Sequence, residues 1–99
     1  MNKLQRINKI KIQLKPLDPV KLQVIDESAQ HIGHEGAQDG RGHYAVNIVS
    51  HQFNDKTLIE RHQMVYDALG KLMQTEIHAL KIKALSPGEL HHNEPRDFI

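Results

Sequence analysis

The sequence predicts an α+β domain, a two-layer sandwich in which helices cover one face of a three-stranded mixed sheet. Two segments alternate apolar with polar residues, as half-buried strands do, and a third is rich in β-branched and aromatic residues. Apolar residues also recur every three or four positions before the first strand and before the third, which is the spacing of amphipathic helices. The predicted order is therefore helix, strand, strand, helical segment, strand and short helix.

The N-terminal helix is predicted by one apolar stripe, formed by Leu4, Ile7, Ile10 and Leu14. It ends before Pro16, because proline cannot continue a helix and disfavours helical geometry in the residue before it. Residues 19–27, "PVKLQVIDE", are predicted as the first strand, with an apolar side formed by Val20, Leu22 and Val24. Residues 43–50, "HYAVNIVS", are predicted as its antiparallel neighbour.

The second half of the chain is predicted to be helical over residues 57–75, with Asp55 or Thr57 as the cap. Gly70 is either a weak point in one long helix or the break between two shorter helices. Residues 77–85, "IHALKIKAL", are predicted as the third strand. The helical crossover lets this strand run parallel to one of the first two.

The end of the chain carries the start signal of a short helix in Ser86, Pro87 and Glu89. We expect one domain over residues 1–90 and a flexible tail at 91–99, where apolar residues are few. The open face of the sheet is expected to carry Lys21, Lys81 and Lys83.

Composition narrows the function classes. The chain has no cysteine, which excludes disulfides, thiolate nucleophiles and cysteine-ligated zinc. No apolar run approaches the ~20 residues of a membrane span, so we expect no membrane association. The N-terminal segment is basic and amphipathic, as transit peptides are, but it lacks serine and is sparse in arginine. It is therefore predicted to be structural, and the protein to be cytoplasmic.

No catalytic motif is present, so the chain is predicted not to be an enzyme. The carboxylates of Asp26, Glu27 and Asp39 are interpreted as solvated surface. His62 lies on the apolar stripe of the 57–75 segment and is interpreted as a structural, hydrogen-bonded residue. Its neighbour Arg61 is expected to be solvated or to pair with a phosphate or carboxylate of a partner.

The remaining histidines leave several interpretations open. The predicted loop 28–42 is longer than most connections in compact domains. The stretch "HIGHEGAQDGRGH" at 31–43 contains His31, His34 and His43 among four glycines. It is either a flexible surface loop or part of a metal site. Nothing in it predicts the rigid support that a metal site formed by this chain alone would need. His78 alternates in step with the apolar residues of its strand, which predicts that its side chain lies on the same face of the sheet as theirs. It is either a ligand or a structural histidine at the strand edge.

Four segments, together with Phe53 and Lys56, resemble the BolA family: "VIDES" at 24–28, "HYAVNIVS" at 43–50, "RHQMVYDAL" at 61–69 and "IHALKIKALSP" at 77–87. The resemblance runs from about residue 3 to residue 90. It implies a helix–strand–strand–helix–helix–strand fold similar to a class II KH domain, which divides the 57–75 segment into two helices.

The resemblance also implies a partner. BolA-like proteins bind monothiol glutaredoxins and share a bridging [2Fe–2S] cluster with them, so the isolated chain is expected to bind no cofactor. Glutaredoxin and glutathione supply the thiolates, while the BolA-like chain supplies the histidine of its "HAL" motif and a loop residue. By position these ligands are His78 and His31, with His34 as the alternative to His31. His43 matches a family histidine that is not interpreted as a ligand, and the chain alone is expected to be a monomer or weak homodimer.

The alternative interpretation is a KH-like DNA-binding transcriptional regulator of morphology or stress genes. The available basic residues are Lys56, Arg61, Lys71, Lys81 and Lys83. A net charge of +1 predicts weak binding at most. The chain departs from the family at Asp55, where glycine is frequent, and at Gln63, where a second arginine is frequent.

Overall fold

The structure is a computed structural model that describes residues 2–28 and 41–90. The described residues form the predicted α+β order, with three α-helices and three strands. These elements are α1 (Lys3–Leu14), β1 (Pro19–Asp26), β2 (Gly42–Ser50), α2 (Leu58–Leu69), α3 (Leu72–Thr75) and β3 (Ile77–Leu85). Most of the predicted 28–42 loop and the whole predicted tail lie outside the described residues.

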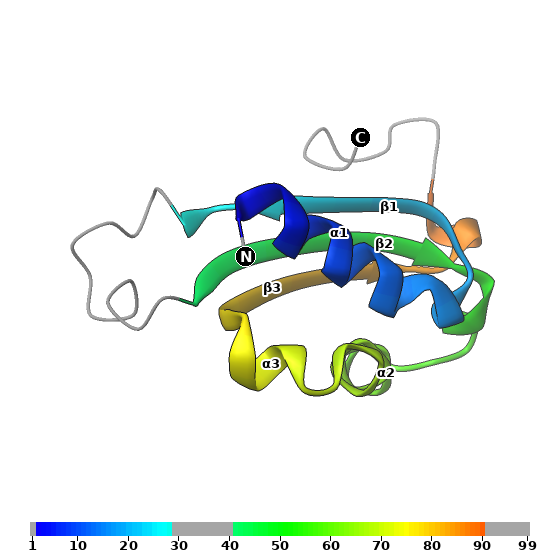
Figure 1. Ribbon diagram of the computed structural model, residues 1–99. Coiled ribbons are helices and arrows are strands. Elements are labelled where there is room, and N and C mark those ends of the chain that lie inside the picture. The colour runs from blue at the N-terminus through cyan, green and yellow to red at the C-terminus, as the bar shows by residue number, and fades with distance from the viewer. Residues whose placement is uncertain (1, 29–40, 91–99) are drawn as a thin grey trace.

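The sheet has the strand order β1–β2–β3. β1 pairs with β2 in the antiparallel direction, and β3 pairs with β2 in the parallel direction, as the sequence predicts. Because β2 is the central strand, all nine of its residues are buried. The end of β1 and the beginnings of β2 and β3 therefore lie at the same end of the sheet (Figure 1).

The division of the predicted helical segment follows from its residues. Thr57 caps α2 in a capping box, in which its side chain accepts the N–H of Glu60 and the Glu60 carboxylate accepts the N–H of Thr57. Gly70 has φ 53°, which ends α2 and separates it from α3. A further turn of 3₁₀ helix, Pro87–Glu89, occupies the place of the predicted final short helix.

One core joins the helices to the sheet. The three helices lie together on one side of the sheet (Figure 1). They bury their apolar faces against the alternate residues Tyr44, Val46 and Ile48 of β2. The buried helical residues of this core are Ile10, Leu14, Val65, Leu69 and Leu72.

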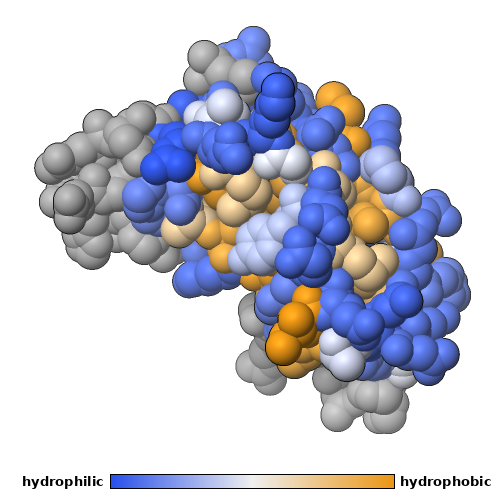
Figure 2. Space-filling view, turned by 90° about the horizontal axis from the view of Figure 1, so that it is seen from below, coloured by the Kyte–Doolittle hydropathy of each residue, from blue (hydrophilic) through white to orange (hydrophobic). Residues whose placement is uncertain are grey.

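Some residues of the predicted apolar stripes do not reach this core. Leu4 is 66% exposed and Leu58 is 65% exposed, because each lies in the first turn of its helix. Val20 is also exposed, since the β1–β2 register shifts between Pro19 and Lys21 and leaves Val20 as the extra residue of a bulge. Figure 2 shows apolar surface between polar margins on the side where α2 and α3 lie in Figure 1.

None of the helices in the described part of the chain has the length and apolar character that crossing a membrane requires.

Candidate functional site

The candidate site lies at the end of the sheet where β1 ends and β2 and β3 begin. The chain leaves this end at Ser28 and returns to it at Arg41. Glu27 and Ser28, which follow β1, are held against the beginning of β2. The Glu27 N–H donates to the His43 carbonyl at 2.7 Å, and the His43 N–H donates to Ser28 Oγ at 3.0 Å. The predicted ligands His31 and His34 belong to the segment between these flanks, outside the described residues.

His78 lies in a bulge at the beginning of β3. Gly42 of β2 pairs with Ile77, whereas the next residue, His43, pairs with Ala79, so His78 is the extra residue. Because of this bulge, His78 does not alternate with the apolar residues of the strand in the way that the sequence predicts. Ile77 enters the core with no exposed surface, and His78 is exposed instead.

Two side chains lie beside the His78 ring. Arg41 Nη2 lies 3.2 Å from His78 Nδ1. The His43 ring centroid lies 5.2 Å from that of His78, with the two ring planes inclined by 51°. His43 is 8% exposed. Of these two imidazoles, His78 is therefore the one that a second protein can reach.

The sequence interpretation did not include Arg41. The only feature of the neighbouring sequence that distinguishes this arginine is its position between Gly40 and Gly42, just before the second strand. Its position beside the His78 side chain depends on the parallel pairing of Gly42 with Ile77, which joins segments 35 residues apart.

The beginning of β2 is closely packed beneath this site. A Cβ on Gly42 would lie 2.6 Å from the Tyr44 ring, so only glycine fits there. The Gly42 N–H donates to the Glu76 carbonyl at 2.9 Å, and the Glu76 carboxylate pairs with Arg6 of α1 at 3.1 Å. Burial raises the pKa of the Tyr44 hydroxyl, and the Asp26 carboxylate on the paired strand adds to this shift. These contacts fix the backbone next to His78.

The described residues hold no group of three or more His, Cys, Asp or Glu side chains placed to bind a metal ion.

The predicted nucleic-acid residues do not form one surface. Lys56 and Lys71 flank opposite ends of α2, whereas Lys81 and Lys83 lie on the face of the sheet opposite the helices. This open face contains a hollow of about 270 Å³, and Lys81 pairs there with Glu27 at 3.3 Å.

The expectation that Arg61 is solvated is wrong. It is 6% exposed, and its Nε and Nη1 donate to the carbonyls of Lys56 and Ala84 at 2.9 and 3.0 Å. Its guanidinium also binds both carboxylate oxygens of Glu89, at 2.6 and 3.3 Å. Arg61 therefore joins α2 to the end of β3 and to the final turn. His62, beside it, is half-buried, and its structural role stays a prediction.

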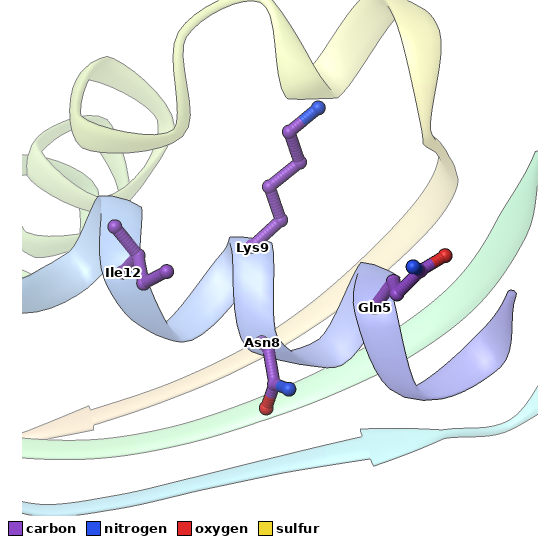
Figure 3. A pocket seen from close by; sticks show the side chains of 4 residues that line it. All are labelled: Gln5, Asn8, Lys9 and Ile12. Carbon is purple, nitrogen blue, oxygen red and sulfur yellow. The ribbon is translucent and has the colours of Figure 1, made fainter. Parts of the chain in front are cut away.

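A second hollow, of about 390 Å³, lies along α1. The described residues that line it are Gln5, Asn8, Lys9 and Ile12, and Asn8 and Lys9 point in opposite directions (Figure 3). Because its polar groups diverge, this hollow offers no set of donors aimed at one ligand.

Comparison with known proteins assigns the family. The model of the BolA family, described as "BolA-like protein", matches residues 14–89. SufE-like protein 1, chloroplastic/mitochondrial, from Arabidopsis thaliana is 42% identical over an alignment of 81 residues, and the match covers 77% of this chain and 22% of that protein. Protein BOLA1, chloroplastic, from the same plant is 41% identical over an alignment of 78 residues, and the match covers 76% of this chain and 49% of that protein. The chain thus spans less than half the length of these two relatives.

Solved structures agree with this assignment. The BolA domain of SufE1 from Arabidopsis thaliana is 38% identical and superimposes with a TM-score of 0.76, covering 91% of this chain and 99% of that domain. BolA1 from the same plant is 34% identical with a TM-score of 0.74, covering 87% and 96% of the two chains. The mixed α+β fold with its three-stranded sheet is shared with both structures. The chain belongs to the family of BolA-like proteins.

Proposed function

We propose that this chain is a non-enzymatic binding module that pairs with a monothiol glutaredoxin and shares a bridging [2Fe–2S] cluster with it. Such a pair would act in iron–sulfur trafficking or in regulation by iron or redox state. The observation that carries the proposal is the position of His78. Its imidazole is exposed in a bulge, next to the point where the 29–40 segment rejoins the sheet.

The donor set fits a shared cluster rather than a private one. A [2Fe–2S] cluster is held by four cysteine thiolates or, in Rieske centres, by two cysteines and two histidines. This chain has no cysteine, and its described residues contain no cluster of three candidate ligands. His78 offers one nitrogen donor, and the thiolates are proposed to come from the glutaredoxin and glutathione, as the family resemblance implies.

The second ligand of the chain is proposed to be His31, with His34 as the alternative. These residues follow Ser28 by three and six positions, so the extended chain reaches about 11 and about 22 Å beyond Ser28. Ser28 itself is hydrogen-bonded to the backbone of His43, whose ring lies 5.2 Å from the His78 ring. Chain length therefore permits either histidine to reach the same iron as His78.

The bound cluster would supply one-electron redox chemistry, at a higher potential than a cluster with thiolate ligands alone. The contribution of this chain is to present a neutral imidazole from a rigid strand end. Protonated histidine cannot ligate a metal, so complex formation should weaken in acid.

The test is a titration of the glutaredoxin with its cluster bound, followed by absorption and circular dichroism in the visible range. We expect the wild-type chain to change both spectra and His78→Ala to change them weakly or not at all. His51→Ala is the matched control, because His51 is also exposed but follows the opposite end of β2. Unchanged spectra with the wild type, or equal responses from His78→Ala and the wild type, would refute the proposal.

One comparison favours a second candidate function. The Escherichia coli protein named DNA-binding transcriptional regulator BolA is 36% identical over 64 residues, which are 65% of this chain and 58% of that protein. We propose as the alternative a class II KH-like module that binds DNA weakly. The lysines beside α2, Lys56 and Lys71, and those on the open face, Lys81 and Lys83, are separate candidate contacts, and the buried Arg61 is not one of them. Exposed Gln63 donates to Asp67, so this position adds no positive charge. Binding that falls steeply with salt would support this function, and no binding at ~50 mM salt would refute it.

A further inference from the structure

We propose that the outer face of α1 docks an acidic amphipathic helix of another protein. The docking surface lies along a helix and not at the end of the sheet, so the proposal goes beyond the glutaredoxin function and does not depend on it. Three observations carry it. A hollow on α1 has the spacing of a helix-packing site, apolar side chains are exposed beside the hollow, and the helix contains no acidic residue.

The hollow along α1 has the residue spacing at which helices pack against each other. It is an open hollow of about 390 Å³, lined at positions i, i+3, i+4 and i+7 of the helix by Gln5, Asn8, Lys9 and Ile12. Gln5 and Ile12 lie at its two ends along the helix (Figure 3). Asn8 and Lys9 point away to its two sides. Four residues at these positions form the hole that receives one side chain of a facing helix in knobs-into-holes packing.

The apolar side chains on this face are placed for such packing. Ile12 is 57% exposed and Leu4 is 66% exposed, although α1 also buries Ile10 and Leu14 in the core. Leu4 and Ile12 are separated by about 12 Å along the helix, with Asn8 between them. A partner helix that lies along α1 would remove both side chains from water, which stabilises the complex.

The charge of α1 selects the kind of partner. No acidic residue precedes Asp18, whereas the helix and the turn that follows it contain five basic residues, Lys3, Arg6, Lys9, Lys11 and Lys15. Arg6 is paired with Glu76. Lys9, Lys11 and Lys15 are exposed. By helical spacing, Lys9 lies on one side of the hollow, and the other two lysines lie on the opposite side. Carboxylates that flank the apolar residues of a partner helix would therefore meet cations on both sides.

Other occupants fit this face less well. A second copy of α1 would bring like charges together. For a lipid surface the apolar area is small, because the other apolar residues of α1 belong to the core and only Leu4 and Ile12 are largely exposed. Nucleic acid would place phosphates over these two apolar side chains, and the net charge of +1 attracts it weakly. An acidic amphipathic helix matches both the apolar and the basic residues.

The test uses the full chain and a synthetic peptide as the partner. The peptide has about three heptads, with leucine at positions a and d and with glutamate at e and g, where like charges oppose its self-association. Binding is measured by isothermal titration calorimetry and by the amide chemical shifts of the ¹⁵N-labelled chain. We expect saturable binding with the largest shifts in α1. The control peptide has lysine at e and g and should bind at least about ten-fold more weakly.

Two pairs of variants locate the binding surface. Ile12→Glu removes the exposed apolar side chain and should weaken binding about ten-fold, and Lys9→Glu reverses a flanking charge and should weaken it about three-fold. The matched controls, Ile59→Glu and Lys71→Glu, make the same changes at exposed positions in α2 and just after it. They should alter the dissociation constant by less than about two-fold. Far-ultraviolet circular dichroism checks that all four variants are folded.

Several results would overturn the proposal. These are no saturable binding up to about 1 mM of the glutamate peptide, equal binding of the two peptides, or control variants that weaken binding as much as the α1 variants. Self-association of the chain, or binding to duplex DNA or to vesicles of phosphatidylserine and phosphatidylcholine, would assign the face to another occupant if the α1 variants abolish it and the glutamate peptide does not bind. A negative result with glutaredoxin leaves this proposal standing, because the peptide binds away from His78.

Discussion

Replacement of Arg61 by methionine should destabilise the fold, because this arginine joins three separate segments. Its Nε and Nη1 donate to the carbonyls of Lys56, before α2, and Ala84, near the end of β3. Its guanidinium also pairs with Glu89 in the final turn, and this carboxylate accepts the Ser86 N–H at 2.7 Å. Arg61→Met keeps most of the apolar stem and removes all of these hydrogen bonds.

The magnitude follows from the groups that lose a partner. Two backbone carbonyls beside the buried guanidinium lose their donor, at about 1–1.5 kcal/mol each. The Glu89 side chain is 45% exposed, so solvent screening limits its loss to less than about 1 kcal/mol. The free energy of unfolding of Arg61→Met should therefore fall by about 2–4 kcal/mol. Glu89→Gln should cost less than about 1 kcal/mol, because it leaves both carbonyls paired.

The assay is urea unfolding followed by far-ultraviolet circular dichroism, with the slope against urea compared between proteins. Lys71→Met is the matched control, since it removes an exposed cation after the same helix and should change stability by no more than about 0.5 kcal/mol. The reasoning is refuted if Arg61→Met is as stable as the control, or if Glu89→Gln costs as much as Arg61→Met.

Three other substitutions test the packing and the electrostatics of the described residues. Gly42→Ala should lower the unfolding free energy by about 1–3 kcal/mol, because the new Cβ would lie 2.6 Å from the buried Tyr44 ring. Thermal unfolding measures this loss, and an unchanged melting temperature would contradict it. Asp55→Gly should raise the unfolding free energy by about 0.5–1 kcal/mol, since Asp55 has φ 62°, a conformation that glycine adopts without steric cost. Chemical denaturation measures the change, and a lower unfolding free energy than that of the wild type would contradict it. The Arg61 hydrogen bond lowers the pKa of Glu89 in the folded state from 4.5, so its stabilisation is present above pH 4.5 and is lost as the pH falls through the lowered value. Glu89→Gln should therefore lose less stability on acidification below pH 4.5 than the wild type, and parallel acid curves would contradict this.

The strands and helices could be predicted because their signals are local. The predicted third strand, 77–85, has the observed bounds, since turn residues follow it and its lysines alternate with apolar residues. The residues around Gly70 left open whether the segment is one helix or two, and the positive φ of Gly70 is the physical reason for the break. The capping pair of Thr57 and Glu60 lies within one helical turn.

The features that the sequence did not reveal depend on distant partners. A bulge inserts one residue into one strand of a pair, so it becomes visible only when the register with the neighbouring strand is known. For this reason the alternation pattern wrongly predicts that the side chains of Val20 and His78 lie on the same face as the apolar residues of their strands. Arg61 could not be recognised as buried because its carboxylate partner, Glu89, is 28 residues away. The prediction for His31 and His34 stays a prediction, because both lie outside the described residues.

The central claim is that His78 supplies a nitrogen ligand to a cluster shared with a glutaredoxin. The most direct measurement is pulsed electron paramagnetic resonance of the reduced mixed complex, with only the histidines of this chain labelled with ¹⁵N. We predict strong hyperfine coupling to ¹⁵N in the wild type and in the His51→Ala control, with the His78 coupling missing in His78→Ala. A mixed complex without ¹⁵N coupling, or one whose coupling is unchanged in His78→Ala, would contradict the claim.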